Sequence, residues 1–195
     1  MKNLELQKCI LGPVYTNCYF LKNKTTGEMI VIDPADFPEK IYEKVIQMGG
    51  KPAAILLTHG HFDHIMAAQA VKEKYNIPIY ACRQEEEMLR EPSVNMTAHY
   101  GKNCSIIPDV LLNDLEVFQV AGFTIQIIHT PGHTKGSCCY YIEEEDVLFS
   151  GDTVFYGSVG RTDFPGGSTA DIVRSLHKLV DSLPEETEVF PGHDA

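Results

Sequence analysis

The sequence predicts an α/β protein, an αββα sandwich of two mixed β-sheets flanked by helices. Two observations carry this prediction: strand-like segments occur in two groups, and amphipathic helical segments lie between and after those groups. The length of 195 residues and the 44% hydrophobic content suit one well-buried core and are short for two independent units. We therefore expect a single domain spanning residues 1–195.

The first group opens with short segments bounded by Gly, Pro, Asn or charged residues, as strands are; they cover residues 4–11, 17–21 and 29–32. From 38 to 48 the apolar residues recur at helical spacing before Gly49-Gly50, which predicts an amphipathic helix. A strand over 53–57 that is buried on both faces, a helix over 65–75 and a strand over 77–81 then give a β-α-β pattern.

The second group contains four further segments with strand patterning, separated by Gly-containing or acidic turns; they cover residues 117–120, 123–129, 138–142 and 147–149. A closing helix over 170–183 and a short strand over 189–190 complete the chain. The interval 85–109 has mixed polarity and little period. Two interpretations stay open for it, an active-site loop and a packing insertion.

The charge balance limits the partners of the protein. The sequence has 27 acidic and 16 basic residues, a formal net charge of −11, so a phosphate backbone or an anionic membrane surface would be repelled. The first ten residues lack the pattern of a signal peptide, and no apolar run approaches the roughly 18 residues that span a bilayer. We expect a cytoplasmic protein that binds neither nucleic acid nor membrane; the oligomeric state is not indicated.

The densest polar motif follows the predicted strand 53–57 and reads HGHFDH. It places His59, His61, Asp63 and His64 within six positions, a density that packing does not require. Imidazole and carboxylate are ligands that zinc prefers, and a loop leaving a strand can direct neighbouring side chains toward two points. This loop alone supplies too few ligands for two ions.

Three later residues share the same context, a strand-like segment followed by a Gly or Pro turn. His133 stands in Pro-Gly-His-Thr, Asp152 in Ser-Gly-Asp-Thr and His193 in Pro-Gly-His. Because a strand end projects a side chain from a rigid scaffold, these three are the candidates for the remaining ligands.

Taken in order, HGHFDH, PGHT, SGDT and PGH resemble the signature of the metallo-β-lactamase superfamily, over residues 9–195. The resemblance implies that two divalent metal ions are bound, zinc being the first expectation and iron or manganese the alternatives. It also implies the ligand sets: His59, His61 and His133 for one ion, Asp63, His64 and His193 for the other, and Asp152 between them.

The branch within the superfamily is indicated by Asp152, where the antibiotic-hydrolysing branch has a cysteine. This makes β-lactamase activity unexpected and resembles the branch of glyoxalase II, lactonases and persulfide dioxygenases. The stretch GSVGRTDFPGG is similar to short glyoxalase II-like (hydroxyacylglutathione hydrolase-like) hydrolases. Glyoxalase II itself adds a helical C-terminal domain that carries much of the glutathione site, whereas two residues follow His193 here.

The function implied by the resemblance is hydrolysis of a small-molecule thioester such as S-lactoylglutathione by metal-bound hydroxide. Asp63 is the candidate catalytic residue, orienting the hydroxide or accepting its proton. An iron-dependent persulfide dioxygenase is the alternative, with one iron on His59, His133 and Asp152, and a lactonase is a third possibility. Arg161 and Tyr15 are the candidate substrate-binding residues; an equally good interpretation pairs Arg161 with Asp163.

Overall fold

The first sheet of the computed structural model, which describes residues 2–194, has six strands in the order β1-β2-β3-β4-β5-β6. Strands β1 to β3 pair antiparallel, and β3 to β6 pair parallel. Their bounds are β1 Leu4–Leu11, β2 Thr16–Asn23, β3 Glu28–Ile32, β4 Lys51–Leu56, β5 Ile79–Cys82 and β6 Val110–Leu112. The sheet is therefore mixed, as predicted.

The second sheet has five strands in the order β13-β10-β9-β8-β7. Its pairs are antiparallel except β10 with β13, which run parallel. The bounds are β7 Val117–Val120, β8 Phe123–His129, β9 Cys138–Ile142, β10 Val147–Gly151 and β13 Glu188–Pro191; β11 Val154–Phe155 and β12 Ser158–Val159 form a separate small hairpin.

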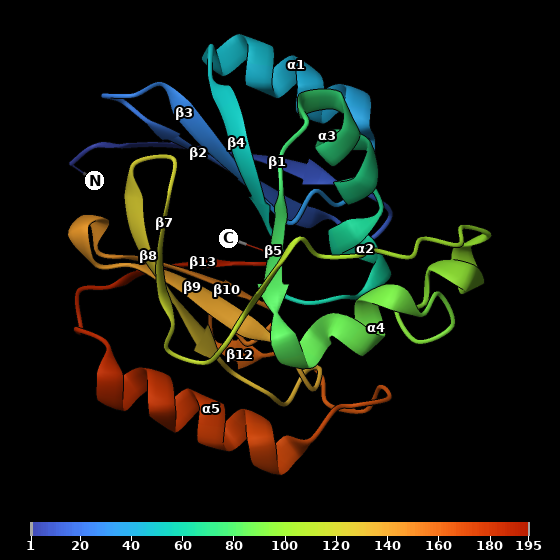
Figure 1. Cartoon of the computed structure of the whole chain (residues 1–195). Helices are drawn as coiled ribbons and strands as arrows, with labels where there is room; N and C mark the ends of the chain where they lie inside the picture. The colour runs from blue at the N-terminus through green and yellow to red at the C-terminus, as the bar shows by residue number, and fades with distance from the viewer. Residues whose placement is uncertain (1, 195) are drawn as a thin grey trace.

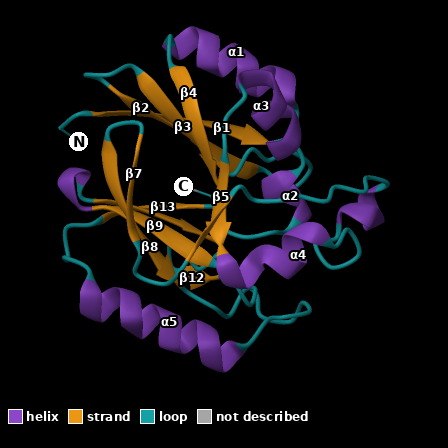
Figure 2. Cartoon of the chain, in the orientation of Figure 1, coloured by secondary structure: helices purple, strands orange, loops and turns teal. Residues whose placement is uncertain are grey.

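The two sheets face one another across the central core, with helices on both outer faces (Figures 1 and 2). The core between the sheets includes Leu21 and Ile30 from the first sheet and Tyr140 and Phe149 from the second, each buried. The Tyr140 hydroxyl donates to the Leu57 carbonyl at 2.9 Å, which links β9 to the end of β4. The predicted αββα sandwich is confirmed.

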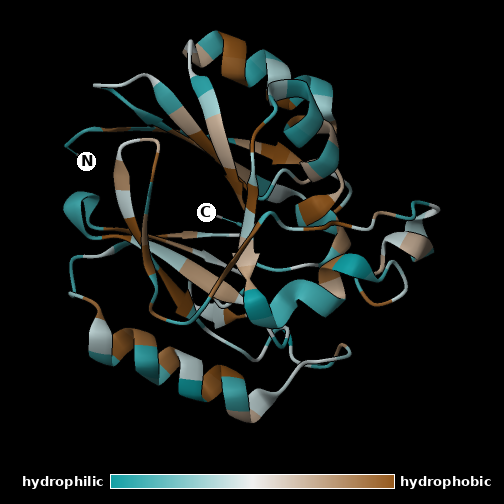
Figure 3. Cartoon of the chain, viewed as in Figure 1, coloured by the Kyte–Doolittle hydropathy of each residue, from teal (hydrophilic) through white to brown (hydrophobic). Residues whose placement is uncertain are grey.

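Helices α1 (Pro38–Met48) and α3 (Ala68–Tyr75) cover the first sheet, and α5 (Thr169–Ser182) covers the second. Helix α1 has the predicted bounds because its buried Ile41, Val45 and Met48 share one face and Gly49 ends it with a φ of 62°. Helix α5 alternates polar and apolar positions, visible as teal and brown bands in Figure 3. Its Ser168 side chain caps the first turn.

In and around the first sheet, the structure differs from the sequence-based expectation at three places, and in the second half of the chain the hairpin of β11 and β12 had not been expected. The helix expected over 65–75 is two helices, α2 (Phe62–Ile65) and α3. The chain breaks between them where the Ala67 amide donates to the Pro34 carbonyl at 3.0 Å. The strand expected over 77–81 begins at Ile79, and strand β6 had not been expected.

The interval 85–109 contains helix α4 (Glu86–Arg90) and a 3-10 turn over Thr97–Tyr100, both close to the HGHFDH loop. Across residues 2–194, none of the helices combines the length and the apolar character that crossing a membrane requires.

Candidate metal centre

The ends of four strands bring the candidate ligands together. The HGHFDH loop follows β4, His133 follows β8, Asp152 follows β10 and His193 follows β13. Two backbone bonds join these strand ends. The Cys138 amide donates to Thr58 O at 2.9 Å between the two sheets, and the Gly192 amide donates to Gly151 O at 2.7 Å between neighbouring strands of the second sheet. The strand topology therefore positions loops that are far apart in the sequence.

The seven candidate ligands form overlapping groups whose nitrogen and oxygen atoms lie within 4.8 Å of one another. The three groups are His59, His61 and His133; His59, His64 and Asp152; and Asp63, His64 and His193. The first and third match the ligand sets that the resemblance implied. Asp152 lies between them, with its Oδ2 atom 3.4 Å from both His133 Nε2 and His193 Nε2.

The first group offers neutral imidazoles. Burial and the neighbouring His133 lower the pKa of His61 to about 3, although Asp63 and Asp152 oppose the shift. Burial and His64 likewise hold the pKa of His59 well below its usual range. His61 Nδ1 lies 2.9 Å from His133 Nε2. A metal-binding histidine must be unprotonated, so the environment of this group already favours the ligating form.

The third group, with Asp152 beside it, pairs two ionised carboxylates with two histidines. Burial opposes ionisation of Asp63 and of Asp152, but the charge of His64 and the hydrogen bonds from His193 and His64 keep both carboxyl pKa values well below the usual range. In return, bonds to Asp152 and Asp63 outweigh burial and raise the pKa of His193 to about 9. A divalent cation can replace the protons that this pair of carboxylates attracts.

Three buried atoms in the centre have no hydrogen-bond partner: His59 Nε2, His61 Nε2 and Asp152 Oδ1. Leaving a buried polar atom unpaired costs about 1–3 kcal/mol, so a cluster of three requires an explanation. Imidazole nitrogen and carboxylate oxygen are donors for zinc and for iron. The residues present therefore fit divalent metal ions, and the identity of the metal is not fixed by this donor set.

Asp33 is a functional residue that the sequence reasoning missed. Its buried carboxylate accepts from His64 Nδ1 at 2.8 Å, from the Thr58 amide at 2.8 Å and from the Thr58 hydroxyl at 2.6 Å. The bond to Nδ1 leaves the Nε2 atom of His64 facing Asp63 and Asp152. Asp33 directly follows strand β3, but it lacks the glycine that precedes His133, Asp152 and His193, so the turn pattern did not identify it.

Three more bonds orient the ligands. The Thr16 hydroxyl donates to Asp63 Oδ2 at 2.7 Å, His133 Nδ1 donates to the Arg161 carbonyl at 2.8 Å, and Thr58 Oγ1 lies 3.2 Å from His59 Nδ1. Each of these contacts fixes the ring or carboxylate plane of a candidate ligand.

An open cavity of about 320 Å³ adjoins the centre and is lined by Asp63, His61 and His193 together with apolar side chains. Tyr100, from the interval 85–109, forms part of the cavity wall and stacks on Phe62 with 4.0 Å between the ring centroids. That interval therefore contributes to the wall of the site, which the active-site-loop interpretation had proposed.

Of the two candidate substrate-binding residues, Arg161 lines this cavity and Tyr15 lines a neighbouring one. The Arg161 guanidinium makes two 2.7 Å bonds to Asp163 and stacks on Phe164 at 3.8 Å. The expected ion pair of Arg161 with Asp163 is therefore present, and substrate contact by Arg161 stays a prediction. Tyr15 is 74% exposed and lines an adjoining cavity of about 410 Å³ that also reaches His193.

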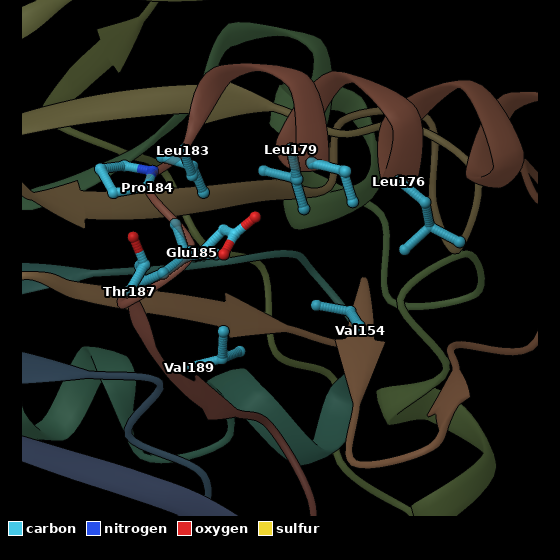
Figure 4. A pocket seen from close by; sticks show the side chains of 10 residues that line it. Val154, Leu176, Leu179, Leu183, Pro184, Glu185, Thr187 and Val189 are labelled. Atoms are coloured by element: carbon cyan, nitrogen blue, oxygen red, sulfur yellow. The ribbon is translucent and has the colours of Figure 1, made fainter.

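A second, more apolar cleft of about 360 Å³ lies between α5 and the strands of the second sheet (Figure 4). Leu176 and Leu179 of α5 face Val154 and Val189 across it. Within residues 2–194, none of its lining side chains is one of the seven candidate ligands. The candidate ligands His61, Asp63, His133, Asp152 and His193 line the other cavity.

The comparison with known families agrees with this geometry. The model of the Metallo-beta-lactamase superfamily matches residues 11–193. The chain therefore belongs to the metallo-β-lactamase superfamily, and membership in this superfamily of metallo-hydrolases points to an enzyme that binds divalent metal.

Two curated relatives refine the position of the chain within the superfamily. The probable metallo-hydrolase YqgX of Bacillus subtilis is 37% identical over 192 residues, which is 97% of this chain and 90% of that protein. Hydroxyacylglutathione hydrolase GloC of Haemophilus influenzae is 30% identical over 166 residues, covering 84% of this chain and 78% of the relative.

Three solved structures share the fold over nearly the whole chain. BLEG-1 B3 metallo-beta-lactamase has a TM-score of 0.91 at 38% identity and covers 98% of this chain and 92% of its own. TTHA1623 in a di-iron-bound form has a TM-score of 0.83 at 34% identity, and the match covers 97% of this chain and 92% of that chain. ETHE1 from Myxococcus xanthus has a TM-score of 0.78 at 25% identity, and the match covers 98% of this chain and 76% of that chain.

Proposed function

We propose that this chain is a dinuclear metal-dependent hydrolase of small-molecule thioesters such as S-lactoylglutathione, that zinc is its metal and that it works in the cytoplasm. The observation that carries the proposal is the convergence of seven histidine and aspartate side chains beside one open cavity, with three of their buried atoms unpaired. A closed structural site uses four ligands and leaves no cavity beside them.

The assignment of ligands follows the observed groups. His59, His61 and His133 would hold one ion, Asp63, His64 and His193 the other, with Asp152 shared. When bound, two divalent ions lower the pKa of water toward neutrality and stabilise negative charge that develops on a carbonyl oxygen.

The side chains around the centre would do the remaining work. Asp63 lines the cavity and is held by the Thr16 hydroxyl, so it can orient the attacking water and accept its proton. The apolar wall of Phe62, Tyr100 and Phe164 would pack the acyl group and exclude bulk water.

Thioesters are the favoured substrate class for two reasons. The relative from Haemophilus influenzae is a hydroxyacylglutathione hydrolase. In addition, a thiol has a pKa near 8.5, so its thiolate leaves with little acid catalysis. The formal charge of −11 also suits a small molecule better than a nucleic acid or an anionic membrane.

The di-iron-bound form of TTHA1623 supports iron as an alternative metal. The second candidate is therefore the iron-dependent persulfide dioxygenase that the sequence resemblance implied, with His59, His133 and Asp152 holding one iron. The 38% identity to BLEG-1 requires a β-lactam among the test substrates, since the sequence argument against that activity depends on Asp152 alone.

The test is the rate of S-lactoylglutathione hydrolysis by zinc-loaded protein, followed by thiol release. We expect turnover that His61→Ala abolishes, which excludes a contaminating enzyme. A lactone and a β-lactam are measured in parallel by ring opening. Absence of thiol release, together with oxygen uptake by iron-loaded protein on glutathione persulfide, would overturn the hydrolase in favour of the dioxygenase.

A further inference from the structure

Glu85 is a buried carboxylate outside the candidate ligand set, and the turn that follows strand β5 carries it. It accepts three hydrogen bonds, each 2.8 Å long: Oε1 accepts from the Gly60 amide and the Thr134 hydroxyl, and Oε2 accepts from the Gly136 amide. Figure 1 shows helix α4, which follows this turn directly, beside the end of β5.

These three donors belong to the two loops that supply one ligand group. Gly60 separates His59 from His61, and Thr134 directly follows His133. Glu85 therefore joins loops that lie 25 and 49 positions away from it in the sequence and contacts them through backbone and hydroxyl groups. None of its three hydrogen bonds involves a candidate ligand side chain.

The local backbone is built for this close approach. A Cβ atom on Gly136 would lie 2.2 Å from the Glu85 nitrogen, and one on Gly60 would lie 2.9 Å from Met88 Cγ. Both positions need glycine so that the turn can reach the two loops. The Thr134 hydroxyl also lies 2.7 Å from Ser137 Oγ, which accepts from the Thr134 amide, so the second loop is braced internally.

Removing this carboxylate would be costly. Burial raises the pKa of the Glu85 carboxyl to about 7, although its three hydrogen bonds oppose this shift. Without the side chain, two buried amides and one buried hydroxyl would lose their acceptor, and the loops would be free to separate.

We propose that Glu85 is a positioning residue that fixes the HGHFDH loop against the His133 loop and so sets the affinity of the His59, His61 and His133 group for metal. The inference rests on the metal centre of the proposed function and is independent of the substrate. Groups that hydrogen-bond a metal ligand directly contribute roughly 10–100-fold to metal affinity, and we take this range as the upper limit for a residue that acts through the ligand loops.

The experiment compares Glu85→Gln and Glu85→Ala with the matched control Glu145→Gln. Glu145 is also a buried carboxylate that accepts backbone amides, those of Lys2 and Asn3. It precedes strand β10, whose opposite end leads to Asp152, and neither of its partners belongs to a loop that carries a candidate ligand. Zinc affinity is measured by competition with a chromophoric chelator, the ligand field by the absorption of the cobalt(II) form, and the stability of metal-free protein by thermal unfolding.

We expect Glu85→Gln to weaken zinc binding about tenfold and to change the cobalt spectrum, since the amide keeps one acceptor and loses the other. Glu85→Ala should weaken zinc binding further, toward about 100-fold. Glu145→Gln should lower the unfolding temperature with zinc affinity unchanged. If Glu85→Ala does not fold, the glutamine variant decides alone.

Zinc affinity and a cobalt spectrum at wild-type values in Glu85→Gln would overturn the inference, as would an equal loss of affinity in Glu145→Gln. A wild-type protein that binds zinc but releases no thiol from S-lactoylglutathione overturns the proposed substrate and leaves this test intact. A wild-type protein that binds neither metal overturns the centre and the inference together.

Discussion

Replacing Asp33 with asparagine should remove the hydrogen bond that fixes the protonation state of His64. Asp33 Oδ2 accepts from His64 Nδ1 at 2.8 Å and from the Thr58 hydroxyl at 2.6 Å, while Oδ1 accepts from the Thr58 amide. Asparagine has one acceptor oxygen. If that oxygen keeps the bond to the Thr58 amide, its NH₂ group faces His64 Nδ1, so the singly protonated ring that metal binding requires would carry its proton on Nε2 in place of Nδ1.

The moved proton would disable the ligand. His64 Nε2 lies 3.3 Å from Asp63 Oδ2 and from Asp152 Oδ1, so a protonated Nε2 would be stabilised there and could not bind metal. Loss of such a partner costs roughly 10–100-fold in metal affinity, or about 1.4–2.7 kcal/mol. We expect a loss of zinc affinity near the upper limit of this range, because the proton on His64 Nε2 gains two carboxylate partners.

The assay is zinc competition with a chromophoric chelator at neutral pH. Asp36→Asn is the matched control: Asp36 lies three positions further on, accepts from the Phe37 amide at 2.8 Å and pairs with Lys102 at 3.1 Å. Neither partner is a candidate ligand, so the control should bind zinc like the wild type. Wild-type zinc affinity in Asp33→Asn would refute the assignment of the His64 proton to Nδ1.

Two further predictions concern the same centre. Hydrogen bonds to Asp152 and Asp63 outweigh burial and raise the pKa of His193 from 6.5 to about 9. In chelator-treated protein, the stability that these bonds contribute is therefore complete below pH 6.5 and is lost as the pH rises toward 9. Thermal unfolding across this pH range measures the loss, and an unfolding temperature that does not change with pH would contradict it. Gly192→Ala would place a Cβ atom 2.3 Å from Asp152 Oδ1 and displace that carboxylate. We therefore expect zinc binding to be weaker by at least about tenfold, and a zinc content that dialysis does not reduce would contradict this.

The ligand positions were predictable because each follows a strand and a turn, and strand ends of one sandwich edge meet. Parallel pairing of β3 with β4 and of β10 with β13 brings those ends to one place. The motif HGHFDH adds a local density of donors that packing does not explain. Sequence order and spacing were therefore sufficient to identify His59 and Asp152 as candidates that the structure brings together.

Asp33 and Glu85 could not be found in the same way. Each is a single carboxylate without a local pattern, and its partners lie 25 to 51 positions away. Their importance depends on burial and on which backbone amides the fold presents to them. The break between α2 and α3 has a similar origin, because the Ala67 amide bonds to Pro34 in place of continuing one helix.

Arg161 offers a last prediction that separates substrate contact from its pairing with Asp163. Both side chains are largely exposed, at 56% and 66%, and exposed ion pairs are weak because water screens them. A carboxylate on the substrate could therefore displace Asp163 at small cost. His133 bonds to the backbone carbonyl of Arg161, so a change of the side chain leaves that contact in place.

Arg161→Ala should raise the KM for an anionic thioester with zinc content and kcat near wild type. Asp163→Ala should lower the KM about two- to fivefold, because the guanidinium loses a competing carboxylate. Steady-state kinetics on S-lactoylglutathione, compared with an uncharged thioester, measures both effects. If the two variants shift KM in the same direction and to the same extent, the pair acts as one structural unit, and Arg161 does not bind the substrate.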